Sequence, residues 1–355
     1  MGLADTALGT AWIDQASRAL EQPLSISLPY RELARFDPAR PEAVGYRFEA
    51  IRGQRIEISV EIRDGEQGRM FADLFRVGET SSPAMPQVAS IAEELNQIAF
   101  EPRRTGEYVL RLQPELLRGG YFVVTIRSVP SVGFPVQGAD MSDIGSFFGD
   151  SRDGGARQHE GVDIFAPRGT HVLAGVTGTV RSVRTLERGG LIVAVEADGS
   201  GLTLYYAHLN EQLVSRGQRV GPEDVIGTVG NTGNAITTPP HLHFGIYEPR
   251  WRAVDPWEFL YRYDTEPPEI AGDERLIGVP ARATRVSVLQ GTRLVAGDPS
   301  EPAGVSETLT VVRDETVIIL GAAGDRYRVL LPDLGVTGYL GTVDVAPLST
   351  SATGT

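Results

Sequence analysis

The sequence predicts a mainly β protein organised as three β-rich modules. Short runs alternate apolar and polar residues with a period of two, which is the pattern of a strand that buries one face. Glycine and proline account for 41 and 23 of the 355 residues, and they lie between these runs instead of forming one low-complexity tract. No helical stretches separate the runs beyond an N-terminal segment, so we expect strands to dominate.

The N-terminal part consists of a segment at 1–23, with a helix expected around 4–20, and a β-sandwich at 24–130. This sandwich contains no histidine and no convincing acid pair, so we expect it to be non-catalytic. Its strand signals are the alternation of Ile56, Ile58, Val60 and Ile62 with polar residues, the same alternation at Tyr108, Leu110 and Leu112, and the continuous β-branched and aromatic run 121–126.

Two further modules follow, each introduced by a break in the strand pattern. A glycine- and proline-rich stretch opens the central module, 131–263, and the sequence DTEPPEIAG begins a linker at 264–274. Residues 275–348 contain more short strand signals, at Thr316–Leu320, Tyr327–Leu331 and Gly338–Leu340, in a length that suits a small barrel. The tail 349–355, STSATGT, is typical of a disordered end.

Composition excludes several kinds of chemistry. The chain has no cysteine, which excludes disulfides, thiolate metal sites and cysteine nucleophiles. It also has no lysine, so all 33 basic residues are arginine, and Schiff-base chemistry and a P-loop lysine are excluded. The net charge of −13 argues against a nucleic-acid-binding face, and no apolar run approaches the ~20 residues of a membrane span.

The first residues, MGLADTALGTAWIDQ, lack the basic start and apolar core of a secretory signal. Gly2 followed by Thr6 fits the short myristoylation pattern. We favour the alternative that a signal peptide has been removed ahead of this start.

The five histidines, at 159, 171, 208, 241 and 243, all fall inside 85 residues of the central module. In the extended segment His159-Glu160-Gly161-Val162-Asp163, the even spacing places His159 and Asp163 on one face. The glycine between them has no side chain to block a shared ion. Taken alone, this segment is equally compatible with ion binding and with a local hydrogen bond.

A second segment, His241-Leu242-His243-Phe244-Gly245-Ile246, would direct both histidines to one side of a strand and its apolar residues to a core. Two histidines and one carboxylate suit a zinc-type ion with an open fourth position for water, which is the catalytic arrangement. Surplus histidines beside such a water can move protons or stabilise an oxyanion, and His208 is the natural third contributor. His171 is expected to be a bystander.

At these residues the sequence resembles the LytM and lysostaphin-like zinc metallopeptidases. The resemblance covers about 140–262 and rests on FGDSRDGGARQHEGVDIFAPRGTHVLA, LYYAHL and VIGTVGNTGNAITTPPHLHFGI, in the order of the family. It implies an antiparallel β domain of lysostaphin type that binds one Zn²⁺ per chain. The implied zinc ligands are His159, Asp163 and His243, and the implied catalytic residues are His208 and His241.

The flanking modules show weaker resemblances. Residues 24–130 look like the bacterial prepeptidase C-terminal type of sandwich, and 275–348 look like bacterial SH3-like domains, which implies wall or ligand binding. Such a sandwich could occlude the cleft of the central module until it is displaced.

The predicted function is a zinc metalloendopeptidase that cuts stem or cross-link peptides of bacterial peptidoglycan, outside the cytoplasm. Arg152, Arg157 and Tyr206 are the candidate substrate-binding residues, with the arginines pairing with peptide carboxylates. A non-catalytic zinc-binding regulator of another wall hydrolase is the alternative, and its mark would be a missing ligand or catalytic histidine. A phospho-carrier on a related β fold is a second rival, but the histidine and aspartate pattern fits a metal better than a phosphate.

Overall fold

The computed structural model describes residues 5–63, 69–78, 85–91, 96–262, 266–284, 287–289, 310–312, 314–333 and 336–348. Within these ranges the chain is mainly β, which confirms the predicted fold class, and most of its strand pairs are antiparallel. No helix of the described part is long and apolar enough to cross a bilayer. The tail 349–355 and Gly2 of the myristoylation pattern lie outside the described residues.

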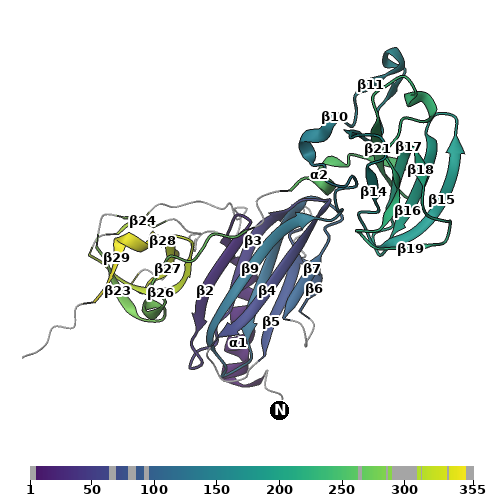
Figure 1. Cartoon of the computed structure of the whole chain (residues 1–355). Helices are drawn as coiled ribbons and strands as arrows, with labels where there is room; N and C mark the ends of the chain where they lie inside the picture. Colours follow the sequence, from purple (N-terminus) through teal and green to yellow (C-terminus); the bar gives the residue numbers. More distant parts are fainter. Residues whose placement is uncertain are drawn as a thin grey trace, which may run out of the picture.

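Two packed sheets form the N-terminal sandwich (Figure 1). Alternation explains its core, because Ile56, Ile58 and Val60 are buried while the residues between them are partly exposed. A helix, α1 (Ala7–Glu21), lies against one sheet, where the indole of Trp12 donates to the carbonyl of Pro114. One sheet holds, in spatial order, β1 (Leu24–Ser25), β3 (Val44–Ala50), β8 (Gly106–Pro114), β5 (Met70–Arg76) and β6 (Gln87–Ser90), and the other holds β2 (Tyr30–Phe36), β9 (Gly120–Pro130), β4 (Gln54–Arg63) and β7 (Gln97–Phe100).

The central part is built on one long antiparallel sheet with a smaller sheet beside it. One of its inner strands is β21 (His241–Glu248), which buries Leu242, Phe244 and Ile246 in the core as the sequence predicts. The long sheet runs β10 (Ile144–Ser146), β13 (Val162–Phe165), β21, β17 (Thr203–Leu209), β16 (Gly190–Ala197), β15 (Gly178–Leu186) and β19 (Arg219–Val220), with β22 (Arg252–Val254) beside β21. The smaller sheet holds β14 (His171–Leu173), β20 (Val225–Thr228) and β18 (Glu211–Gln212), and β11 (Ser151–Arg152) and β12 (Arg157–Gln158) form a hairpin.

The C-terminal part continues a sheet of the sandwich, which the sequence does not predict. Strand β26 (Thr316–Ala323) pairs with β2, so that Leu33 lies opposite Ala322. Leu33 and Val123 of the sandwich therefore belong to the apolar core that the C-terminal strands build. The remaining strands here are β27 (Arg326–Leu331), β28 (Val336–Gly341), β23 (Pro280–Ala283), β29 (Val345–Pro347) and the pair β24 (Ser287–Leu289) and β25 (Thr310–Val312).

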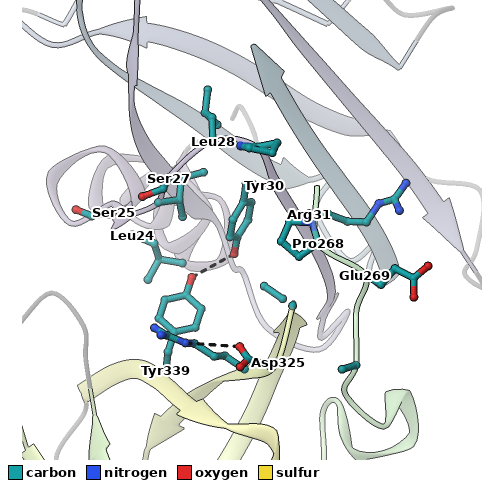
Figure 2. A pocket seen from close by; sticks show the side chains of 16 residues that line it. Leu24, Ser25, Ser27, Leu28, Tyr30, Arg31, Pro268, Glu269, Asp325 and Tyr339 are labelled. Carbon is teal, nitrogen blue, oxygen red and sulfur yellow. Dashed lines mark hydrogen bonds and ion pairs between the residues drawn. The ribbon is translucent and has the colours of Figure 1, made fainter. Parts of the chain in front are cut away.

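A buried ion pair crosses the same seam. Arg328 donates to Glu32 at 2.6 Å, and Tyr46 donates to the other oxygen of this carboxylate. Glu32 is fully buried, so the pair is shielded from water on both sides of the seam. A cavity of about 670 Å³ opens beside it. The hydroxyls of Tyr30 and Tyr339 lie 3.2 Å apart in its lining, and Figure 2 shows them directed toward one another.

The central part meets the other end of the sandwich, close to the short helix α2 (Trp257–Leu260) (Figure 1). Gly53 sits at this junction with φ +94°, and a Cβ there would lie 2.9 Å from the backbone of Glu258. Arg52 forms an ion pair with Glu248 at 2.5 Å. This junction therefore includes a close backbone approach and an ion pair, whereas the C-terminal seam is a shared sheet.

Candidate metal centre and active site

Three donor atoms converge at the junction of β13 and β21. His159 Nε2 and His243 Nδ1 each lie 3.0 Å from Asp163 Oδ1, and the two nitrogens are 2.9 Å apart. The antiparallel pairing places Asp163 directly opposite His243, and His159 enters from the loop before β13. Donors that share one zinc ion, each ~2.0–2.2 Å from it, lie roughly 3 to 3.5 Å apart. The triangle therefore has the donor types and the size that a single divalent ion requires.

Gly161 makes this approach possible. A Cβ at this position would lie 2.8 Å from Cε1 of His243 and 2.4 Å from the carbonyl oxygen of Phe244. Real side chains do not tolerate such contacts with backbone atoms. The absence of a side chain at 161 thus lets the segment from His159 to Asp163 lie against β21.

The ring orientation of His159 is fixed from outside the triangle. Its Nδ1 lies 2.9 Å from the carbonyl oxygen of Phe147, and a carbonyl can only accept, so the proton sits on Nδ1. Nε2 is then left with a lone pair directed at the triangle. This is the neutral tautomer that a metal ligand needs.

The other two clustered histidines stand beside the triangle with the same tautomer. His208 Nδ1 lies 2.9 Å from the carbonyl oxygen of Thr232, and His241 Nδ1 lies 2.9 Å from that of Pro239. Their rings are 5.1 Å apart, and the ring of His208 is 5.9 Å from that of His243. Each therefore keeps an Nε2 lone pair, and His241 Nε2 lies 3.9 Å from Asp163 Oδ1.

Two glycines, Gly190 and Gly233, allow the close packing that orients the His208 ring. A Cβ on Gly190 would lie 2.2 Å from Thr232 Oγ1, and one on Gly233 would lie 2.2 Å from the carbonyl oxygen of Arg188. Both glycines also have a positive φ. The turn that contains Thr232 can therefore pack against the start of β16, which places its carbonyl oxygen beside the His208 ring.

Burial and mutual contact shift the protonation of the cluster. Burial alone raises the pKa of Asp163, but the close approach of the His159 and His243 rings to its carboxylate outweighs burial and holds this pKa well below its usual range. Burial, followed by repulsion from His243 and His241, lowers the pKa of His208 to about 4. Burial also lowers the pKa of His243. An ionised carboxylate among neutral imidazoles is the charge state that binds a divalent cation.

The three predicted substrate-binding residues have different positions. Arg157 lines the open cleft above the cluster. Arg152 also borders the cleft, but its Nη2 donates to Asp163 Oδ2 at 3.0 Å. Tyr206 is fully buried and donates to the carbonyl of Ala174, so the prediction of a substrate contact is wrong for this residue. His171 lies on the exposed side of β14, outside the cleft lining.

The cleft has a volume of about 780 Å³ and is lined entirely by residues between 146 and 247. No described residue of the sandwich or of the C-terminal part lines it, so the sandwich does not occlude the cleft in this structure. The lining also includes side chains that were not predicted from the sequence, among them Glu160, Arg188, Tyr205 and Tyr247. Tyr205 was within reach of prediction, because strand alternation gives it the opposite face from Tyr206.

Comparison with known proteins supports this description of the central part. Residues 157–256 match peptidase family M23. Over 130 residues the chain is 37% identical to the L-Ala--D-Glu endopeptidase of Bacillus subtilis, covering 34% of this chain and 40% of that protein. It is 36% identical over 91 residues to the peptidoglycan DD-endopeptidase ShyC of Vibrio cholerae, covering 26% of this chain and 20% of that protein. The chain thus spans two fifths or less of the length of these curated relatives.

Among solved structures, the catalytic domain of the antimicrobial peptidase lysostaphin from Staphylococcus simulans is similar, with 31% identity, 33% of this chain and 90% of that chain covered, and a TM-score of 0.31. The prepeptidase-like and SH3-like resemblances of the flanking parts, and the domain boundaries, stay predictions. The matched residues 157–256 contain all five residues of the histidine and aspartate cluster. This chain therefore carries a domain of peptidase family M23.

Proposed function

We propose that the chain is a zinc metalloendopeptidase that hydrolyses stem or cross-link peptides of bacterial peptidoglycan outside the cytoplasm. The observation that carries the proposal is the triangle of His159 Nε2, Asp163 Oδ1 and His243 Nδ1, with sides of 2.9–3.0 Å, beside two further histidines in an open cleft. In this proposal the triangle holds one Zn²⁺.

Zinc bound by three protein ligands supplies Lewis acidity toward a carbonyl oxygen and lowers the pKa of water to ~7. The protein contributes the proton transfers. His208 and His241 each keep an Nε2 lone pair toward the cluster, because their Nδ1 protons are held by backbone carbonyls. One would accept the proton of the attacking water at Nε2 and pass it to the amine nitrogen that leaves as the C–N bond breaks. The other would take up a proton from solvent at Nε2 and donate a hydrogen bond to the oxyanion.

Arginine side chains in the cleft favour a peptide that carries carboxylates. Arg157 and Arg188 both line the cleft, and Arg188 is exposed. A guanidinium pairs with a carboxylate through two hydrogen bonds, so the net negative charge of the chain does not prevent binding at this cleft. Free carboxylates on peptidoglycan stem peptides match this lining, and the names of the two curated relatives point to the same substrate class.

The flanking parts are proposed to serve the same substrate. We assign the sandwich at 24–130 and the barrel at 275–348 to non-catalytic roles, with wall binding by the barrel. Since no described residue of the sandwich lines the cleft, we expect the full chain to cleave without removal of an N-terminal part.

The test is digestion of purified peptidoglycan by the full chain and by His208→Ala and His241→Ala, with products identified by mass. We expect zinc to be retained by both variants and cleavage to be lost, by at least ~100-fold, since each removes a general acid or base. The product masses name the bond, whether L-Ala–D-Glu or a D,D cross-link.

Cleavage that persists in both variants would contradict the catalytic assignment. Zinc binding by a wild-type chain that cleaves no peptidoglycan would favour the alternative, a zinc-binding regulator of another wall hydrolase. The matched control is His171→Ala, because His171 lies on the surface outside the cleft and this variant should cleave like the wild type.

A further inference from the structure

Asp163 uses its two carboxylate oxygens for different partners. Oδ1 faces the histidine triangle, at 3.0 Å from both His159 Nε2 and His243 Nδ1. Oδ2 points away from the triangle and accepts a hydrogen bond from Arg152 Nη2 at 3.0 Å. The Asp163 side chain is 13% exposed and the Arg152 side chain is 27% exposed, so water competes only weakly for this pair.

The same guanidinium nitrogen also reaches a second support of the triangle. Arg152 Nη2 donates to Ser146 Oγ, and this hydroxyl lies 3.1 Å from Asp150 Oδ2. Asp150 in turn accepts from the backbone N–H of Phe147 at 2.8 Å, and the carbonyl of Phe147 holds Nδ1 of His159. Arg152 therefore ties the carboxylate to the turn 146–150 that orients the neighbouring histidine.

We propose that Arg152 is a positioning residue for the metal centre, and that it fixes Asp163 so that only Oδ1 is presented to the ion. The proposal rests on the proposed function, since it requires that the triangle binds zinc. Outer partners of this kind set the orientation of a ligand and are typically worth 10–100-fold in metal affinity. Under this proposal the role of Arg152 is to position Asp163, in place of the substrate binding that the sequence predicts.

The two roles differ in a measurable way. A substrate contact leaves zinc affinity unchanged when no peptide is present, whereas a positioning residue changes it. With Arg152 removed, Oδ2 loses its donor, and the carboxylate is free to rotate or to offer both oxygens to the ion. We therefore expect both the affinity and the coordination of the metal to change in the absence of substrate.

The experiment measures zinc affinity of the full chain by competition with a chromophoric chelator, without peptide. The variants are Arg152→Met and Arg152→Gln, which remove the charge, Arg152→Lys, which keeps a donor cation, and Arg188→Ala as the matched control. Arg188 lines the same cleft but lies in the turn between β15 and β16, far in sequence from the metal ligands. We expect a 10- to 100-fold weaker affinity for the Met and Gln variants. The Lys variant should recover part of the loss, and Arg188→Ala should stay within about twofold of the wild type.

Two further measurements separate positioning from a general structural role. The melting temperature of the metal-free Arg152→Met or Arg152→Gln variant should fall only slightly, because without metal the change removes one partly exposed ion pair, whereas zinc affinity should fall 10- to 100-fold. The Co²⁺-substituted variant should show weaker visible absorption than the Co²⁺-substituted wild type, because a second carboxylate oxygen raises the coordination number above four.

Zinc affinity within twofold of the wild type in a folded Arg152→Met or Arg152→Gln variant would overturn the proposal. Two variants are made so that the test still decides if one of them fails to fold. It is equally overturned if affinity and metal-free melting temperature fall together and Lys restores neither. A wild-type chain that binds no zinc would instead refute the proposed function, so the two failures are distinguishable.

Discussion

At the scale of single residues, the site depends on contacts that leave no spare volume. The spacing of His159, Gly161 and Asp163 predicts that a glycine leaves room for a shared ion, and the structure places the ring of His243 in that room. The sequence does not indicate which residue lies opposite Asp163. The pairing of Asp163 with His243 joins positions 80 residues apart, and nothing local to either segment specifies it.

Gly161→Ala should damage the metal centre without changing any ligand. The added Cβ would lie 2.8 Å from the His243 ring and 2.4 Å from a backbone oxygen of β21, so β13 and β21 must separate. We expect zinc affinity to fall at least ~10-fold and the free energy of unfolding by ~1–3 kcal/mol. Chelator competition and denaturant unfolding measure the two. Gly106→Ala, at a glycine with open space around it, is the control, and a Gly161 variant that behaves like this control would contradict the argument.

The buried His208 should make the metal-free protein sensitive to acid. Its pKa falls from 6.5 to about 4 on folding, so between these values the unfolded chain binds more protons than the folded one. Stability is therefore lost as pH drops from about 6.5 to about 4, by up to ~3 kcal/mol. Urea unfolding of the chelated protein at pH 7 and pH 4.5 should show this difference, and His208→Gln should reduce it. An equal reduction in His171→Gln, which alters an exposed histidine, would refute the assignment to His208.

At the scale of elements, strand β17 shows which structural features the residue pattern predicts and which it does not. Its apolar alternation predicts a strand correctly, and Tyr206 opposite Phe244 is part of the core. A strict period of two would place Tyr206 and His208 on the same face. His208 instead has φ +60°, and β17 shifts its register against β16 in this region, so His208 joins the cleft face with Tyr205 and Ala207. Such an irregularity cannot be read from a residue pattern.

The two neighbouring tyrosines of β17 should therefore separate binding from stability. Tyr205→Ala should raise KM for peptidoglycan peptides several-fold, because Tyr205 lines the cleft, and should have a small effect on unfolding. Tyr206→Phe leaves the carbonyl of Ala174 without its donor in the core. It should cost ~1–2 kcal/mol of stability with KM unchanged. Steady-state kinetics and thermal unfolding of both variants check this, and a raised KM for Tyr206→Phe would restore the substrate role that its burial argues against.

At the scale of the whole molecule, the N-terminal sandwich and the C-terminal strands are not structurally independent of each other. The sequence shows β2 and β26 as two ordinary strands almost 300 residues apart, and alternation says nothing about which strand edges meet. Glu32 illustrates the difficulty. A glutamate is normally exposed, yet Glu32 is fully buried, because Arg328 and Tyr46 each donate a hydrogen bond to its carboxylate. The sandwich and the C-terminal strands consequently share a sheet, a core and an ion pair.

This shared seam predicts that the chain unfolds in two independent steps, one for the sandwich with the C-terminal strands and one for the metal-binding part. Arg328→Met leaves the buried carboxylate of Glu32 without its cationic partner. It should lower the temperature of the first transition only, at a cost of ~3–5 kcal/mol in the free energy of unfolding. The double variant Glu32→Leu/Arg328→Met removes both charges and should recover much of that loss, because two apolar side chains replace the pair.

Removal of zinc with a chelator should lower only the second transition, since the triangle lies wholly within residues 159–243. Differential scanning calorimetry of the wild type and the two variants, with and without chelator, resolves these effects. If instead one transition is seen, and both Arg328→Met and the chelator lower its temperature, the junction at Arg52 and Glu248 couples the parts as strongly as the shared sheet does.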